Sequence, residues 1–139
     1  MDSPDLCTAS RLRKAARLAS QVYDAALSPW GLTTGQFGML GAIAQMKGAR
    51  LAEMAERLAM DPSTLSRGIN PLIRQGLVAY EPDPTDRRAK RLRATAKGKA
   101  LHKAARTGWR QAQDEVKLAL GPDTVTRLNQ ALDEAIERL

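Results

Sequence analysis

The segment from residue 61 to residue 88 constrains the fold of this chain more than any other. It begins with D-P-S-T-L-S-R at Asp61, continues to G-L-V at Gly76 and ends with D-P-T-D-R-R at Asp83. An aspartate before a proline marks a helix start, because its carboxylate accepts from free backbone N–H groups and proline has no N–H to satisfy. A glycine suits the left-handed residue that ends a helix. The charged stretch after it predicts the tip of a β-hairpin.

A short capped helix followed by a basic hairpin is typical of a winged helix-turn-helix, which contacts DNA with one helix and one β-loop. Short donors and one long cation occupy the first two turns of the predicted helix, the part that meets base edges and phosphates. These candidate DNA contacts are Ser63, Thr64, Ser66 and Arg67. A plain surface helix could carry the same residues, and the wing behind them favours the DNA-reading interpretation.

The charge distribution favours a polyanionic partner. The 139-residue chain has a formal net charge of +7, and residues 87–110 include ten Lys or Arg residues and no Asp or Glu. A solvated helix face normally mixes both signs, so we expect part of this stretch to contact phosphates.

The chain has few reactive side chains, which argues against catalysis. Cys7 is the only cysteine and His102 the only histidine, so neither a disulfide framework nor a metal site nor a nucleophile–base pair is expected. We predict no catalytic residues, no metal, no cofactor and no enzyme activity. No secretory leader and no apolar run of about 18 residues are present, which predicts a cytoplasmic protein without a membrane partner.

Helical periodicity predicts helices on both sides of the wing. The first spans about residues 5–27, and the second begins at the capping box of Thr33 and Gln36. A short third helix over residues 51–58 precedes the one that opens at Asp61, which makes a trihelical core.

The hairpin and the C-terminal helices complete the predicted fold, which is mainly α with a small β-hairpin wing. Its two strands are residues 77–81 and 90–94, and Thr95 caps a long fifth helix that ends at Gly121, where a sixth begins. The apolar stripes of the terminal helices are longer than a small DNA-binding core can cover. We therefore expect them to pack against a second copy as a homodimer, the alternative being an intrachain bundle.

Taken together, these pieces resemble the MarR family of bacterial transcription regulators, named for multiple antibiotic resistance. The matching text is G-L-T-T-G-Q-F (Gly31–Phe37), L-A-E-M-A-E-R-L (Leu51–Leu58), D-P-S-T-L-S-R (Asp61–Arg67), G-L-V (Gly76–Val78), D-P-T-D-R-R (Asp83–Arg88) and T-A-K-G (Thr95–Gly98). The resemblance covers almost the whole chain. Its strongest joint signal is the wing D-x-R of Asp86 and Arg88 at its distance from the S-T-L-S-R helix.

The resemblance implies a single MarR-type domain over residues 1–139. Residues 1–30 and 96–139 would supply the dimerisation helices, and residues 31–95 would form the winged helix-turn-helix. In most members of the family such a homodimer represses transcription from a pseudo-palindromic operator in double-stranded DNA.

It also assigns roles to the candidate DNA contacts. The four helix residues named above would enter the major groove, while Arg88 would enter the minor groove, oriented by Asp86, with Arg87 beside a phosphate. A guanidinium suits the narrow and strongly negative minor groove, and a nearby carboxylate can fix its direction by paired hydrogen bonds.

Three residues depart from the family pattern. Arg50 stands where the third helix usually has a Ser or Thr cap, so either that helix starts less cleanly or Arg50 reaches a phosphate. Pro71 lies inside the recognition helix, where it removes one hydrogen bond and costs roughly 3 kcal/mol unless the helix bends. Ala94 replaces a leucine before Thr95, a small loss of packing.

Members of the family commonly respond to small aromatic or phenolic compounds bound between the dimer helices and the winged module. The residues here that could line such a site are Tyr23, Trp30, Phe37 and Met39, with Arg11 or Arg17 as a carboxylate partner. Core packing is the plain alternative for the aromatic residues. The predicted function is a repressor that a small aromatic effector releases from its operator.

Two other functions stay open. In the organic hydroperoxide regulators of the family a cysteine near the start of the first helix senses peroxide, and Cys7 lies in a similar region with Arg11 one turn away. The tyrosine partners expected there are not evident. A sequence-indifferent architectural DNA-binding protein would keep the basic stretch but show little preference among promoters. His102 is expected to be exposed or at an interface.

Overall fold

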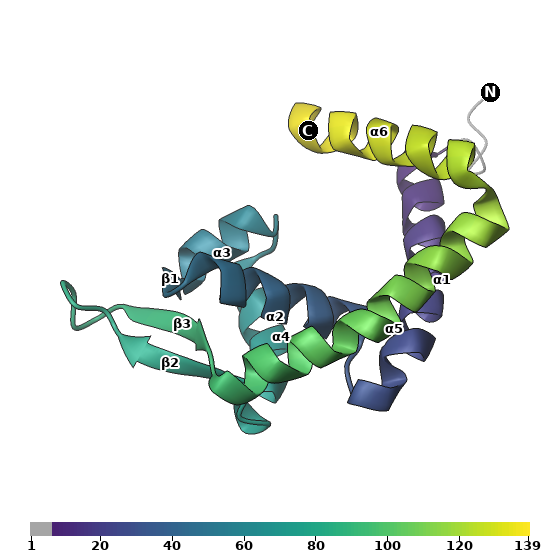
Figure 1. Ribbon diagram of the computed structural model, residues 1–139. Coiled ribbons are helices and arrows are strands. Elements are labelled where there is room, and N and C mark those ends of the chain that lie inside the picture. Colours follow the sequence, from purple (N-terminus) through teal and green to yellow (C-terminus); the bar gives the residue numbers. More distant parts are fainter. Residues whose placement is uncertain (1–6) are drawn as a thin grey trace. The chain divides into compact units, whose positions relative to one another are not determined.

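The computed structural model describes residues 7–139, which fold into two compact units. We call residues 30–106 the central unit, and residues 7–29 together with 107–139 the terminal unit. The long helix α5 (Ala96–Leu120) gives its first half to the central unit and its second half to the terminal unit. Figure 1 labels the helices and strands of both.

Three helices of the central unit precede the β-hairpin along the chain. They are α2 (Thr34–Met46), α3 (Leu51–Arg57) and α4 (Pro62–Arg74). The predicted capping box at the start of α2 is confirmed. The Thr33 hydroxyl accepts from the Gln36 N–H at 3.2 Å, and the Gln36 amide oxygen accepts from the Thr33 N–H at 3.0 Å. Two of the orphan donors of the helix are thereby satisfied.

The start of α4 is also as predicted. The Asp61 carboxylate accepts from the backbone N–H of Ser63 at 3.0 Å and of Thr64 at 3.4 Å. The helix continues through Pro71. Its inner face carries three buried side chains and the half-buried Ile73; the buried ones are Leu65, Ile69 and Leu72.

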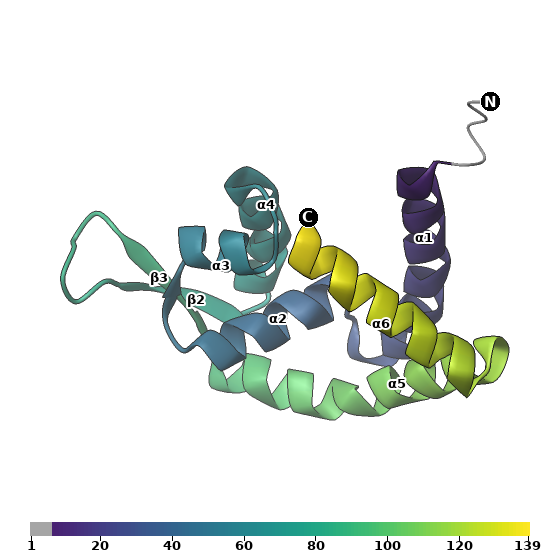
Figure 2. The same ribbon diagram turned by 90° about the horizontal axis from the view of Figure 1, so that it is seen from above.

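The sheet is larger than predicted. It has three antiparallel strands in the order β1 (Ala49–Arg50), β3 (Lys90–Ala94) and β2 (Val78–Pro82), whereas the sequence indicated only the β2–β3 hairpin. β1 was missed because two residues are too short to show alternation. Arg50 pairs with Arg91 across β1 and β3. The hairpin extends beyond the helices of the central unit and forms a wing (Figure 2).

Thr95 joins the wing to α5. Its hydroxyl accepts from the Gly98 N–H at 3.0 Å, which confirms the predicted cap, and donates to the Gly76 carbonyl at 2.6 Å. A Cβ on Gly98 would lie 2.0 Å from the Leu77 carbonyl oxygen, so only glycine allows this close approach. Ala94, where the family has a leucine, is nevertheless buried.

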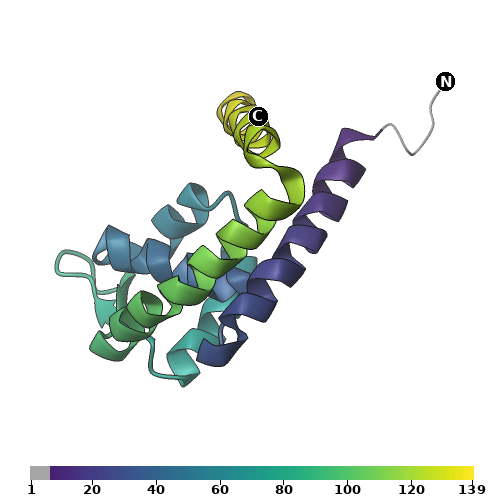
Figure 3. The same cartoon turned by 45° about the vertical axis from the view of Figure 1, so that its right-hand side comes forward.

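The terminal unit consists of α1 (Thr8–Leu27), the second half of α5 and α6 (Pro122–Arg138). The end of α1 meets the second half of α5 (Figure 3), where the Tyr23 hydroxyl donates to the Gln113 amide oxygen. Gly121, at φ 84°, ends α5 and begins α6, as predicted. The expected first turn, at residues 5–6, lies outside the described residues. Within residues 7–139, no helix is long and apolar enough to cross a membrane.

Candidate nucleic-acid interface

The first turns of α4 carry the predicted major-groove residues on an open surface. Ser63, Thr64 and Arg67 are exposed, while Ser66 is half-buried. The Ser63 hydroxyl donates to the Asp61 carboxylate, and this bond, with the two backbone N–H bonds, holds the pKa of Asp61 below its usual value. The Arg67 guanidinium lies 3.4 Å from the Thr64 hydroxyl oxygen, so these two side chains share one face of the helix.

The wing loop carries Asp86, Arg87 and Arg88, and all three are exposed. Asp86 does not hold Arg88 in the way that the sequence suggested. Its carboxylate accepts from the backbone N–H of Arg88 at 2.9 Å, so it fixes the chain at that residue rather than the guanidinium. The Arg88 side chain therefore extends from a fixed piece of backbone.

Asp83, at the base of the wing loop, is a residue that the sequence analysis did not single out. It is buried and accepts from the Nε atoms of Arg50 and Arg91, both at 2.9 Å. Hydrogen bonds from Thr85 and from the two guanidinium groups hold the pKa of this carboxyl far below its usual range. The D-P-T letters are an Asx-turn signal, but the two arginines come from other strands, so the motif alone could not reveal them.

The pairing with Asp83 explains why an arginine occupies position 50. Arg50 contributes no side-chain cap to α3, as the departure from the family pattern indicated. Its guanidinium is instead paired with Asp83, with the side chain 40 % exposed.

Several other cations of the basic stretch also have partners within the protein. Arg93 pairs with Glu81 at 3.1 Å, the Lys97 ammonium donates to the Gln75 carbonyl at 2.9 Å, and Lys90 lies over the Tyr80 ring. Part of the charge in this stretch thus makes contacts within the wing and at its junction with α5. Arg87 and Arg88 at the tip remain predicted DNA contacts.

The six predicted effector residues divide between the two units. Arg11, Arg17 and Tyr23 belong to the terminal unit, and Trp30, Phe37 and Met39 belong to the central unit. Met39 packs close to the backbone of α4, because a Cβ on Gly68 would lie 2.9 Å from its terminal methyl carbon. Arg11 and Arg17 are exposed on α1.

Phe37 lies in a cleft that the sequence did not reveal. Its ring stacks on the His102 imidazole with 4.3 Å between centroids and 16° between planes. His102, which the sequence predicted to be exposed or at an interface, is half-buried. The cleft has a volume of about 440 Å³ and is also lined by Gly41, Arg57 and Arg106. Burial, aided by Arg106, lowers the pKa of His102. The two guanidinium groups can donate hydrogen bonds to a carboxylate, and the neighbouring rings offer an apolar surface to an aromatic group.

Cys7 is exposed and occupies the position before the first turn of α1. Hydrogen bonds from the backbone and hydroxyl of Ser10 lower the pKa of its thiol. In the described part of the chain, no three His, Cys, Asp or Glu side chains gather in a way that could hold a metal ion.

These features match a known family. A model described as MarR family matches residues 30–89 of the chain. The solved structure of the transcriptional regulator MosR of Mycobacterium tuberculosis in complex with DNA is 38 % identical in sequence, with a TM-score of 0.79 over 96 % of this chain and 99 % of that one. The chain belongs to the MarR family.

Other relatives agree with this MarR assignment. An HTH-type transcriptional repressor of Mycobacterium bovis is 34 % identical over 93 residues, which are 67 % of each chain. A protein of Thauera aromatica, described as a transcriptional regulatory protein for its hcr operon, is 35 % identical over 85 residues; the match spans 60 % of this chain and about half, 51 %, of that protein. The MarR chain is a DNA-binding transcription regulator and not an enzyme, and its mainly helical winged helix-turn-helix fold is the one predicted.

Proposed function

We propose that this MarR protein is a cytoplasmic homodimeric repressor of a pseudo-palindromic operator, released by a small aromatic anion. The observation that carries the proposal is the open apolar surface of the terminal unit. No residue of α6 is buried, and large apolar side chains on all three helices of the unit are exposed. They are Leu12, Leu18, Leu118, Leu120, Leu128, Ile136 and Leu139. Such a surface is typical of a protein that associates.

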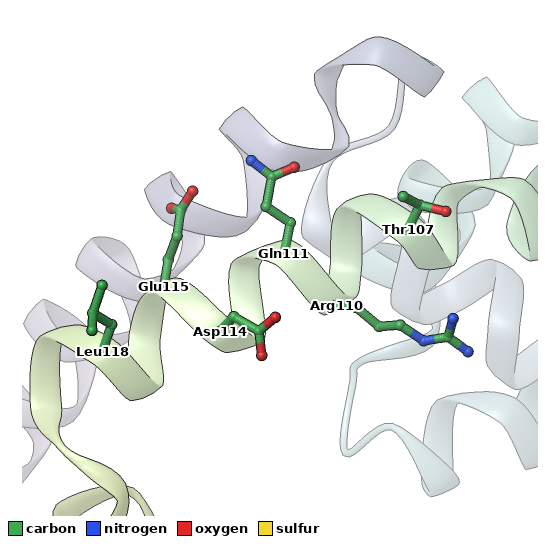
Figure 4. A pocket seen from close by; sticks show the side chains of 6 residues that line it. All are labelled: Thr107, Arg110, Gln111, Asp114, Glu115 and Leu118. Atoms are coloured by element: carbon green, nitrogen blue, oxygen red, sulfur yellow. The ribbon is translucent and has the colours of Figure 1, made fainter.

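One face of α5 suits a two-fold interface. Figure 4 shows six side chains of this helix around a cleft of about 410 Å³, among them Leu118, which is 88 % exposed. Arg110 and Asp114 lie one turn apart on α5 and Glu115 also lines the cleft, so the surface carries both signs of charge. A two-fold axis brings identical surfaces together, and a surface with both signs can complement its own copy.

Two copies would read two half-sites. The exposed first turns of α4 would lie in successive major grooves, about 34 Å apart, with each Arg88 in a flanking minor groove and each Arg87 at a phosphate. Repression is supported by the description of the Mycobacterium bovis relative as a repressor.

The cleft beside Phe37 is the proposed effector site. The ring stack offers an aromatic surface, and Arg57 and Arg106 offer donors for a carboxylate. A ligand that binds only the dimer with wrongly spaced recognition helices shifts the population away from the DNA-competent state. The family resemblance also implies this role for Tyr23, Trp30, Met39 and the α1 arginines, Arg11 and Arg17.

The proposal is tested by three measurements on the full chain. Sedimentation at micromolar concentration should give about twice the 15.1 kDa of one chain. Competition binding should favour the natural promoter over scrambled DNA of equal length, and 4-hydroxybenzoate as a probe should release the promoter. A stable monomer that binds the promoter tightly refutes the dimer, and equal affinity for all DNA indicates an architectural protein instead.

Redox control through Cys7 is the second candidate, favoured by the exposure and lowered pKa of its thiol. We expect Cys7→Ser to bind DNA and to respond to the probe as wild type does. Release by peroxide that disappears in Cys7→Ser would instead place redox sensing first.

A further inference from the structure

A buried carboxylate holds together two like charges at the base of the wing. Arg50 and Arg91 face each other across β1 and β3, an arrangement that is unfavourable for two cations. One oxygen of Asp83, Oδ2, accepts from both Nε atoms at 2.9 Å. The Asp83 side chain has no exposed surface, so it faces these partners and not solvent.

The other oxygen of Asp83 organises the wing loop. Oδ1 accepts from the Thr85 N–H at 2.9 Å, from the Thr85 hydroxyl at 2.8 Å and from the Asp86 N–H at 3.2 Å. Arg91 in turn donates through Nη1 to the Gly48 carbonyl at 3.1 Å. A single carboxylate thus ties the loop both to its own hairpin and to the strand before α3.

The bonds continue from Asp83 to the tip of the wing. Asp86, held by Asp83, accepts through its own carboxylate from the Arg88 N–H at 2.9 Å. The Ala89 N–H donates to the Asp86 carbonyl at 3.2 Å, and the Asp83 N–H donates to the Ala89 carbonyl at 3.3 Å. The backbone at Arg88 is therefore two side-chain hydrogen bonds away from the Arg50–Asp83–Arg91 cluster.

We propose that Asp83 is a positioning residue for DNA binding: together with Arg50 it anchors the wing loop to the strand before α3, so that Arg88 meets the minor groove from one fixed place. This role rests on the proposed function, in which Arg88 contacts DNA. A preorganised side chain loses less conformational freedom when it binds, so its contact contributes more to affinity. Without the anchor, Arg88 would keep its charge but lose much of its effect.

The hairpin supplies a matched control. Arg93 on β3 pairs with Glu81, and both side chains are well exposed, at 50 % and 39 %. An exposed pair of this kind contributes little. Arg50→Gln and Arg93→Gln each remove one positive charge from the three-stranded sheet, but only Arg50→Gln removes a partner of Asp83.

The experiment is a double-mutant cycle on operator affinity. Arg88→Ala is combined in turn with Asp83→Asn, Arg50→Gln and Arg93→Gln, and the dissociation constants are measured at one salt concentration. We expect Arg88→Ala to weaken binding by about 10- to 100-fold in the wild-type and Arg93→Gln backgrounds, the range for a lost arginine contact. In the Asp83→Asn and Arg50→Gln backgrounds the further loss should be under about threefold, because coupled residues are not additive.

A second readout separates positioning from general loss of structure. Arg67→Ala on α4 should cost the same factor in the wild-type and Asp83→Asn backgrounds, because α4 is not held by Asp83. If Asp83→Asn fails to fold, as judged by circular dichroism, Arg50→Gln keeps the Asp83–Arg91 pair and carries the test alone.

Two results overturn the inference, and they differ. An equal loss from Arg88→Ala in every background means that Arg50 and Asp83 act independently of the wing tip, while the wing contact itself stands. Wild-type affinity in Arg88→Ala alone removes the wing contact from the proposed function, and the positioning role with it.

Discussion

Replacing Gly98 by alanine should destabilise the protein, although alanine is the better helix former. The added Cβ would lie 2.0 Å from the Leu77 carbonyl oxygen, 2.9 Å from its carbonyl carbon and 3.2 Å from its Cα. All three are backbone atoms, so no side chain can rotate away. The same carbonyl oxygen accepts from the Thr95 N–H at 3.0 Å, and moving it would strain the bond that joins the wing to α5.

The magnitude follows from two opposing terms. Alanine gains about 0.5–1 kcal/mol over glycine inside a helix. Overpacking costs about 1–3 kcal/mol, and a lost hydrogen bond adds about 0.5–1.5 kcal/mol. The clash therefore wins, and we expect Gly98→Ala to lower the free energy of unfolding by about 1–3 kcal/mol. For a chain of this length the melting temperature should fall by roughly 4 °C per kcal/mol.

Gly38→Ala on α2 is the matched control, because a Cβ there meets nothing within 4 Å. Urea titration and thermal melting, both followed by circular dichroism, would compare the two variants with wild type. Gly38→Ala should be more stable than wild type by about 0.4–1 kcal/mol. If Gly98→Ala proves as stable as Gly38→Ala, the close approach of Gly98 to the Leu77 carbonyl does not exist.

Further predictions concern the proposed dimer, wing and effector site. Leu128→Asp should give a monomer in sedimentation and lose operator affinity, because it places a charge on the exposed apolar surface of α6. Arg88→Ala should reduce the slope of log affinity against log salt by about 1. Gly41→Ala should weaken binding of 4-hydroxybenzoate in a calorimetric titration, since its Cβ would lie 2.7 Å from Nε2 of His102 and displace the imidazole, while Gly35→Ala, outside the cleft, should bind normally. The pKa of His102 is lowered by folding, so the unfolded chain binds its proton first and stability should fall as pH drops below 6.5; His102→Gln should remove that component.

The parts of the fold that could be predicted from the sequence are those whose partners are close along the chain. Thr33, Asp61 and Thr95 each cap a helix by accepting from an N–H two or three residues later. These hydrogen bonds depend only on residues that are close along the chain, so the starts of the helices could be predicted from the sequence. The wing strands were predictable for a similar reason, because charged turn residues separate two short alternating runs.

The parts that could not be predicted depend on distant partners. Arg50 lies 33 residues before Asp83, and His102 comes from a different helix than Phe37. Neither pair has a periodicity or a motif that links its members. The sequence therefore indicated that Arg50 does not cap a helix, and it left the neighbours of His102 open. Only the packed structure shows what each of these two side chains contacts.

The two proposed DNA-reading elements consequently differ in how sequence specifies them. The start of α4 is set by Asp61 and the residues just after it, so the seven-residue segment D-P-S-T-L-S-R is nearly sufficient to specify this element. The wing segment D-P-T-D-R-R is not sufficient to specify the wing, because Asp83 is buried and requires cations at positions 50 and 91. A chain with the same wing letters but apolar residues at those two positions would bury an unpaired carboxylate, which is strongly unfavourable. A matching wing motif therefore indicates an anchored wing of this kind only when arginines also stand at the positions of Arg50 and Arg91.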